Sequence, residues 1–211
     1  MRSGVELREP YVDPGQQHAA AMMGIYIFLA TELMLFGGLF AAALAIRIQH
    51  GPDYIAASRA LHVWIGTINT AVLLTSSLTV ALAVHAARLG KSRHVILLLG
   101  VAALLGLAFL GLKAVEYGEE YGEGLLPSFS DPERFMSPVH RQFMDLYLIA
   151  TSLHALHLLI GIGVLAGIMF RLLRRTLIVP DRSIVVAVGG VYWHLVDVVW
   201  IFLYPALYLA R

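Results

Sequence analysis

A small set of ionisable side chains lies within long apolar stretches of this 211-residue chain. Glu32 stands alone in one stretch, whereas His154 and His157 are three residues apart in a second, and His194 and Asp197 are three apart in a third. Residues three apart lie on one face of a helix. In hydrocarbon an aspartate costs roughly 3 kcal/mol, so such groups usually face a bundle interior and have partners.

Several kinds of chemistry are open to this set. Neutral imidazoles and carboxyls could form hydrogen bonds between helices and so fix their packing. The histidines could be axial ligands of a b-type haem, or could form a non-haem metal site together with the two carboxyls. A buried carboxyl such as Glu32 could also take up and release protons. Spacing alone does not decide among these hypotheses.

Composition predicts the elements that carry these groups. The chain is 59% hydrophobic and 14% charged, with a mean hydropathy of +0.76, which indicates a membrane protein. A membrane-spanning helix needs about 20 apolar residues. The stretches that qualify are roughly Ala21 to Ile46, Val63 to Val84, Val95 to Val115, Phe143 to Phe170 and Ile184 to Leu209.

We therefore predict an all-α, polytopic bundle of five transmembrane helices. It forms one domain over residues 21–211, preceded by a polar N-terminal strip over residues 1–20. The first span begins after that strip and is too long for a signal-peptide core of about 7–15 residues, so we expect it to be retained. Glu32 then lies roughly 16 Å along the first helix, near the middle of the bilayer.

Basic residues predict the orientation. The predicted N-terminal side carries the larger group: Arg2, Arg8, Arg88, Lys91, Arg93, Arg171, Arg174, Arg175 and Arg182. The opposite side carries Arg47, Arg59, Arg134, Arg141 and Arg211. The positive-inside rule then places the N-terminus in the cytoplasm and the C-terminus outside. We interpret the arginine clusters as lipid-headgroup contacts.

Further polar groups lie in the second and third spans. Asn69 and the hydroxyl residues that follow it in the second span are expected to stabilise packing between helices. At the outer end of the third span come Lys113, Glu116 and Tyr117. We expect Lys113 and Glu116 to form an ion pair on one face at the interface, where the lysine can snorkel.

Composition also excludes several functions. The chain has no cysteine, so it can hold no disulfide, thiolate-ligated copper, iron–sulfur cluster or covalently attached c-type haem. Phosphate-binding Gly-rich loops are missing as well. A formal net charge of +1 without a long basic run argues against nucleic acid as a partner.

The run YWHLVDVVW at residues 192–200 resembles the C-terminal signature of subunit III of the haem-copper cytochrome c oxidases. Four further segments are similar to the same family in the same order. They are residues 28–40 around Glu32, residues 69–74, the pair Glu116-Tyr117, and residues 154–157. The chain is similar to the short, five-helix bacterial members, since it lacks the first two of the seven spans in mitochondrial-type members.

This resemblance implies a non-catalytic subunit in the cytoplasmic membrane of a bacterium, with neither a catalytic residue nor a metal ligand of its own. Haems and copper would belong to subunits I and II, its expected partners. In the family, subunit III packs on subunit I, supports proton uptake and protects the enzyme from inactivation during turnover. The family also binds phospholipid.

The resemblance also assigns expected roles to particular residues. Glu32 matches the intramembrane glutamate of the family that reacts with carbodiimide. Arg171 falls where the family has an arginine that binds lipid phosphate, and Arg174 belongs to the same basic cluster. We hypothesise that Glu32 is neutral and hydrogen-bonded, and that the His154/His157 face and the His194/Asp197 face tie the fourth and fifth spans together.

Other members of the same superfamily remain alternatives. Quinol oxidases carry a related five-helix subunit, and a similar protein accompanies some nitric oxide reductases. Glu32 and the complete run at residues 192–200 favour the cytochrome c oxidases. The alternative of another class is a free-standing membrane protein that binds b-type haem or a metal, and this protein would show a Soret band when isolated.

Overall fold

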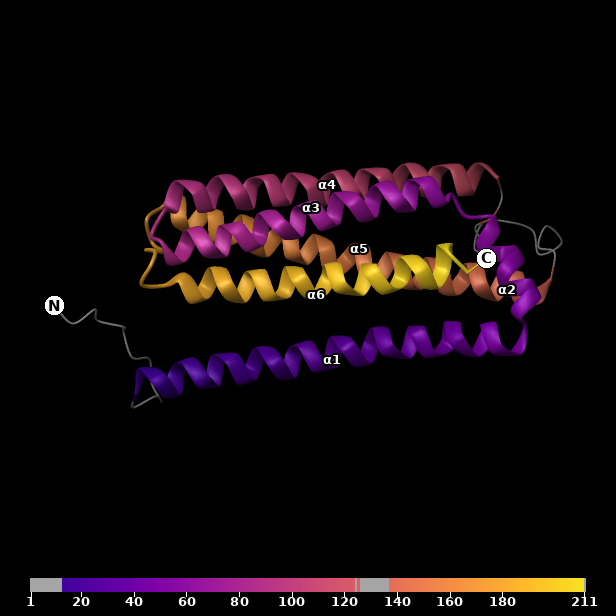
Figure 1. Cartoon of the computed structure of the whole chain (residues 1–211), viewed down its shortest axis with the longest axis horizontal. Coiled ribbons are helices and arrows are strands. Elements are labelled where there is room, and N and C mark those ends of the chain that lie inside the picture. The colour runs from indigo at the N-terminus through magenta and orange to yellow at the C-terminus, as the bar shows by residue number, and fades with distance from the viewer. Residues whose placement is uncertain (1–12, 124, 126–136, 211) are drawn as a thin grey trace.

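The computed structural model describes residues 13–123, 125 and 137–210. Within them the chain forms six helices and no strand (Figure 1). The helices are α1 (Pro14–Gln49), α2 (Gly51–Arg59), α3 (Val63–Arg88), α4 (Ser92–Gly122), α5 (Pro138–Leu173) and α6 (Ser183–Tyr208). The fold is therefore all-α, as predicted.

Five of these helices are long and apolar enough to cross a membrane, which confirms the five predicted spans. Most extend past the predicted ends, because polar residues continue the helix beyond its apolar part. Helix α1 begins at Pro14, which lies inside the N-terminal strip predicted over residues 1–20. Proline is favoured in the first turn of a helix, where its missing N–H has no partner to lose.

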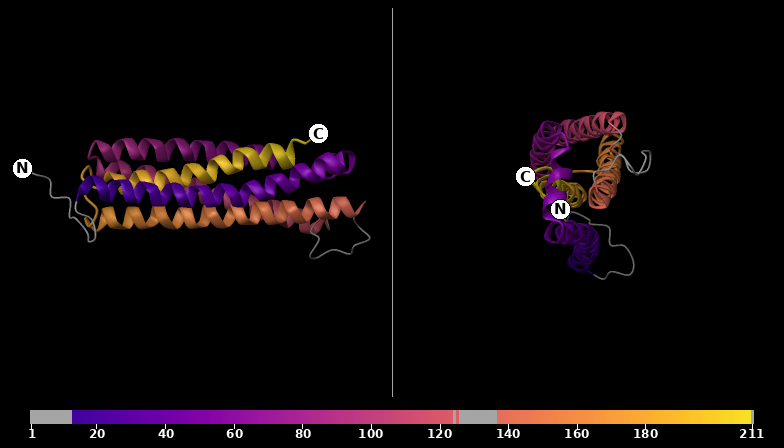
Figure 2. Two further views of the ribbon diagram at one scale, coloured as in Figure 1. Left: turned by 90° about the horizontal axis from the view of Figure 1, so that it is seen from below. Right: turned by 90° about the vertical axis from the view of Figure 1, so that its right-hand side faces the viewer.

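The helices form a four-helix bundle with α1 on its outside. Helices α3, α4, α5 and α6 pack in a ring, in which each contacts two neighbours, and α1 contacts α5 and α6. Figure 2 shows this arrangement end-on. Only 11% of the residues in the most apolar window of α1 are buried, against 50% in α6. Helix α6 is therefore the centre of the packing.

The short helix α2, which the sequence analysis did not predict, covers the C-terminal end of α6. The Tyr54 hydroxyl donates to the Ala206 carbonyl at 2.8 Å, and the Ser58 hydroxyl donates to the Leu207 carbonyl at 2.7 Å. The last carbonyls of a helix lack partners within it. Burial raises the pKa of Tyr54, which keeps its hydroxyl a donor. Helix α2 thus seals this end of the bundle.

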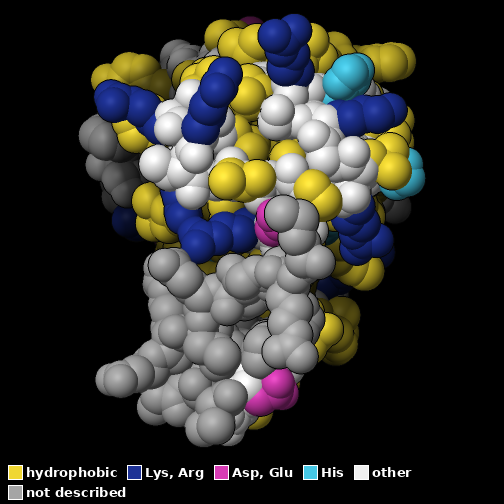
Figure 3. All heavy atoms as spheres, turned by 90° about the vertical axis from the view of Figure 1, so that its left-hand side faces the viewer, with side chains coloured by type: hydrophobic (Ala, Val, Ile, Leu, Met, Phe, Trp, Pro, Cys, Tyr) yellow, Lys and Arg dark blue, Asp and Glu magenta, His cyan; other side chains and the backbone are white. Residues whose placement is uncertain are grey.

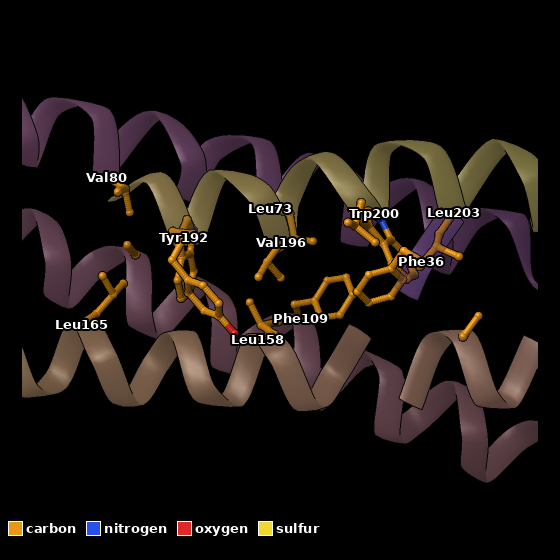
Figure 4. Close-up of a cluster of buried hydrophobic side chains, with 14 of the residues drawn as sticks. Phe36, Leu73, Val80, Phe109, Leu158, Leu165, Tyr192, Val196, Trp200 and Leu203 are labelled. Atoms are coloured by element: carbon orange, nitrogen blue, oxygen red, sulfur yellow. The ribbon is translucent and has the colours of Figure 1, made fainter. Parts of the chain in front are cut away.

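Aromatic and aliphatic side chains fill the interior between the helices (Figure 4). Trp193 of α6 is fully buried, and its indole N–H donates to the Ser76 hydroxyl of α3 at 3.1 Å. Glycines make room for the ring. A Cβ at Gly106 of α4 would lie 2.9 Å from the ring, and one at Gly161 of α5 would lie 3.0 Å from it. Trp193 therefore contacts α3, α5 and, across the ring, α4.

Hydroxyl residues of α3 join this packing, as predicted. The Ser76 hydroxyl donates to the Ala102 carbonyl of α4 at 3.2 Å while it accepts from Trp193. Thr70 accepts from the Trp200 indole at 3.0 Å. Asn69 is fully buried, and its side-chain amide has no hydrogen-bond partner among the residues that the structure describes.

Candidate functional site

Glu32 and His157 form the polar contact between α1 and the bundle. The Glu32 Oε2 and His157 Nε2 atoms are 2.7 Å apart, and the two side chains are 14% and 11% exposed. Phe36, one turn further along α1, packs edge-on against the same imidazole at 5.3 Å between ring centroids. The pair therefore fixes α1 against α5 at the middle of the helix.

The hydrogen bond of the second imidazole nitrogen, Nδ1, indicates how protons are distributed between His157 and Glu32. His157 Nδ1 lies 2.8 Å from the Leu153 carbonyl, which can only accept, so Nδ1 carries a proton. If the imidazole is neutral, Nε2 accepts from a protonated Glu32. If it is charged, Nε2 donates to a Glu32 carboxylate. In both cases one proton is shared between the two groups, and the pair is neutral overall.

His154 has a different environment, although it is one turn away on the same helix. It is fully buried, and its ring packs against Phe109 of α4 at 5.5 Å and against Trp200 of α6 at 5.1 Å. Neither ring nitrogen has a hydrogen-bond partner among the described residues. His154 therefore contacts the centre of the bundle through ring packing, while His157 faces α1.

His194 and Asp197 lie on the side of α6 that faces α3. His194 Nδ1 is 2.8 Å from the Ser77 hydroxyl of α3. Asp197 is 2% exposed, and within the described part of the chain neither carboxyl oxygen has a hydrogen-bond partner. Our hypothesis that this face ties α6 to α5 is therefore wrong for His194, because Ser77 is the nearer partner. Contacts between α5 and α6 in this region include the ring packing of His154 on Trp200 and a hydrogen bond from Tyr192 to the His157 carbonyl at 3.1 Å.

The histidines and carboxyls do not converge on one point. Across the described ranges, no group of three or more His, Cys, Asp or Glu side chains is placed to hold a metal ion. His157 faces α1, His154 faces α4 and α6, and His194 faces α3. The arrangement is that of separate contacts between helices.

Lys113 and Glu116 form the predicted ion pair, at 3.0 Å between Nζ and Oε2, but the pair lies inside the bundle and not on its surface. Their side chains are 3% and 0% exposed. The expectation that Lys113 snorkels is therefore wrong. Three donor hydrogens of the ammonium are satisfied internally, because Nζ also lies 2.8 Å from the hydroxyl oxygens of Tyr147 and Tyr208.

Three residues of this network escaped the sequence analysis: Glu120, Tyr147 and Tyr208. Glu120 is fully buried and accepts from the Tyr147 hydroxyl at 2.6 Å, while the Tyr208 hydroxyl donates to Glu116 Oε1 at 2.7 Å. The spacing of four between Glu116 and Glu120 was the available signal, because it places both carboxyls on one face of a helix. Tyr147 and Tyr208 come from α5 and α6, and nothing local in the sequence pairs them with α4.

The basic residues gather at the opposite end of the molecule. Figure 3 views this end and shows dark blue side chains around its rim. The connections α3–α4 and α5–α6 both lie here, and their basic residues are exposed: Arg88, Lys91, Arg93, Arg171, Arg174, Arg175 and Arg182. Arg174 also stacks over the Phe170 ring at 5.0 Å. Arg2, Arg8, Arg134 and Arg211, which entered the orientation argument, lie outside the described residues.

A groove of about 580 Å³ runs between α1 and α6. Its lining is almost entirely apolar and includes Phe36, Phe40, Val198 and Phe202, with Arg47 as the charged exception. The groove exists because α1 packs loosely along the bundle. Its shape and chemistry suit an apolar chain with an anionic end.

Comparison with known proteins gives consistent matches along nearly the whole chain. A family model described as cytochrome c oxidase subunit III matches residues 15–210. The chain is 30% identical over 199 residues to cytochrome c oxidase subunit 3 of Thermostichus vulcanus, a match that covers 94% of this chain and 92% of the relative. It is 31% identical over 188 residues to quinol oxidase subunit 3 of Bacillus subtilis, covering 89% and 86%. A probable quinol oxidase subunit 3 of Staphylococcus haemolyticus is 30% identical over 192 residues, covering 89% of this chain and 87% of the relative.

Proposed function

The chain belongs to the cytochrome c oxidase subunit III family and is subunit III of a haem-copper terminal oxidase, and from this premise we propose that it is an accessory subunit without a redox centre. The observation that carries the proposal is the divergence of its intramembrane histidines. Each is engaged with a different neighbour, whereas two axial haem ligands would have to face one another. Haems and copper then belong to subunits I and II of the complex.

The proposed role is mechanical support of subunit I, which carries proton uptake and oxygen reduction. The supporting observation is the concentration of polar contacts in α6. This helix is joined to α3 by His194 and Trp193, to α4 by Tyr208, and to α5 by Tyr192. Hydrogen bonds from one helix to three others restrict the movement of these helices relative to one another. A rigid bundle of this kind would in turn restrict the movement of the subunit I helices packed against it.

The proposed branch is a cytochrome c oxidase, with a quinol oxidase as the alternative. Relatives with both names are equally similar, at 30% and 31% identity. We favour a cytochrome c oxidase because the chain has both Glu32 and the complete run YWHLVDVVW at residues 192–200. A complex of the nitric oxide reductase type is the third possibility that the test below separates.

We further propose that the end with the basic connections faces the cytoplasm and that phospholipid binds to the subunit. The clustering of Arg171 and Arg174 with the other exposed basic residues supports both statements. The apolar groove between α1 and α6, with Arg47 at its lining, is a second place where an acyl chain and an anionic group would fit.

Purification of the chain from its native membrane in mild detergent tests this function. We expect it to carry a large haem-copper subunit with it, and we expect phospholipid in the same preparation. The identity of the companion subunits distinguishes the cytochrome c, quinol and nitric oxide branches. Recovery of the chain alone with a bound haem, seen as a Soret band, would contradict the proposal.

The Glu32–His157 pair gives a prediction on the lifetime of the enzyme. Glu32→Ala leaves the Nε2 atom of His157 without its partner, at a cost of about 1–3 kcal/mol. We expect the haem spectrum of the assembled oxidase to be unchanged and its activity to decay faster during continuous turnover. Glu32→Gln is the matched control, since the amide N–H₂ donates to Nε2, and we expect it to behave like the native enzyme. A lost haem signal in Glu32→Ala would refute the assignment.

A further inference from the structure

The buried network at the α2 end of the bundle has an unbalanced charge. It contains one cation, Lys113, and two carboxyls, Glu116 and Glu120, together with the hydroxyls of Tyr147 and Tyr208. All five side chains are 3% exposed or less. If both carboxyls were ionised, the network would hold a net negative charge in an environment that excludes water. An unpaired buried charge costs several kcal/mol.

The hydrogen bonds indicate which carboxyl is ionised. Glu116 accepts at both oxygens, from Lys113 at Oε2 and from Tyr208 at Oε1. Both oxygens of Glu116 are used as acceptors, and one of the two donors is an ammonium, so this arrangement stabilises the carboxylate over the neutral acid. Glu116 is therefore the counter-ion of Lys113.

Glu120 has the opposite pattern. Its Oε1 accepts from Tyr147 at 2.6 Å, but its Oε2 is buried and has no hydrogen-bond partner among the described residues. The donors nearby are already used. The ammonium of Lys113 donates to Glu116 and to both tyrosines, and each tyrosine hydroxyl donates to a carboxyl. A proton on Oε2 leaves one O–H unpaired, which costs far less than an uncompensated carboxylate.

The surrounding groups on the other elements do not supply the missing charge. The electrostatic neighbours of Glu120 are Lys113, Glu116 and Glu123, two of which are acidic. Glu123 lies 3.9 Å from His62, between α2 and α3, and both of these side chains are over a third exposed. Tyr117 of α4 engages Thr151 of α5 at 2.6 Å, and His140 of α5 interacts with Asp53 of α2. His154 of α5 is an electrostatic neighbour of Lys113, but among the described residues neither of its ring nitrogens has a hydrogen bond to the network. None of these contacts brings a second positive charge to the carboxyls of the network.

We propose that Glu120 is a proton-binding residue of this subunit, which takes one proton on Oε2 and thereby makes the Lys113–Glu116–Glu120 network neutral. The proton comes from water and binds reversibly, with no other bond made or broken. Helix α2 lies over this end of the bundle, where Tyr54 and Ser58 donate to the carbonyls two and one residues before Tyr208, and Glu120 itself is fully buried.

Two isosteric variants one helical turn apart test this assignment. Glu120→Gln mimics a protonated acid and should leave the amount of subunit in the purified complex within about twofold of the native amount. Glu116→Gln replaces one of two accepting oxygens by a donor group and should lower that amount roughly tenfold. Equal losses in the two variants would overturn the proposal, and so would the loss of subunit in Glu120→Gln alone.

Infrared difference spectroscopy of the same purified complex gives the direct readout. At neutral pH, native minus Glu120→Gln should contain the C=O stretch of a protonated carboxylic acid, shifted in D₂O. This band should disappear reversibly at alkaline pH. A carboxylate band in its place would show that Glu120 is ionised and would overturn the proposal. If the intensity of that carboxylate band changed with the Na⁺ or K⁺ concentration at constant ionic strength, the site would bind a metal cation instead of a proton. This result would also overturn the proposal.

Discussion

Replacing Lys113 by methionine is expected to destabilise the subunit by about 3–5 kcal/mol, the usual cost of removing one partner from a buried ion pair. The Glu116 carboxylate would keep its place with 0% exposure and lose its cation. Tyr147 and Tyr208 would also lose the donor that orients their hydroxyls. Methionine has a similar length and no charge, so the loss reflects the missing ammonium more than a cavity.

The measurement is the midpoint of unfolding of the subunit in the purified complex as denaturing detergent increases. Lys91→Met, in the exposed α3–α4 connection, is the control and should not shift the midpoint. The double variant Lys113→Met/Glu116→Gln removes both charges and should recover most of the loss, because a neutral pair is cheaper to bury than half an ion pair. A midpoint for Lys113→Met equal to that of the control would contradict the buried network.

The sequence predicted the spans because hydropathy is a local property. Five apolar stretches of the required length are visible without any knowledge of partners. Helix α2 escaped because it is short and polar, and its helical form depends on what it covers. Tyr54 and Ser58 are ordered by carbonyls of α6 about 150 positions later in the chain, and no local pattern contains this information.

The sequence identified most of the residues of the candidate site but not the residues that they contact. Glu32, His154, His157, His194 and Asp197 stand out because charge in hydrocarbon needs a partner, and Glu32 does have one in His157. The partner of His194, Ser77, was not foreseen, because a three-residue spacing does not say which neighbour a face meets. The same limit hid the network at Lys113. Its members come from three helices, and the sequence offers only the spacing on α4.

Helix α6 is the most buried helix of the bundle, so truncation of a large side chain in it should cause a large loss of stability. Trp193→Ala should destabilise the subunit by about 3–5 kcal/mol, the range for truncating a buried aromatic side chain. Within a membrane the loss is chiefly van der Waals contact, because lipid is as apolar as the interior. The indole touches Gly106 of α4 and Gly161 of α5, and it donates to Ser76 of α3. Its removal therefore weakens three interfaces at once.

Trp64 of α3 is the matched control, because it is the same residue type at 82% exposure. Trp64→Ala should leave the unfolding midpoint of the bundle unchanged, whereas Trp193→Ala should lower it and reduce the amount of subunit in the complex. Phenylalanine at position 193 should give an intermediate loss, since it restores part of the ring volume but not the hydrogen bond to Ser76. If the two alanine variants unfold alike, then α6 does not organise the bundle, and the contacts of Trp193 contribute no more than those of a lipid-facing side chain.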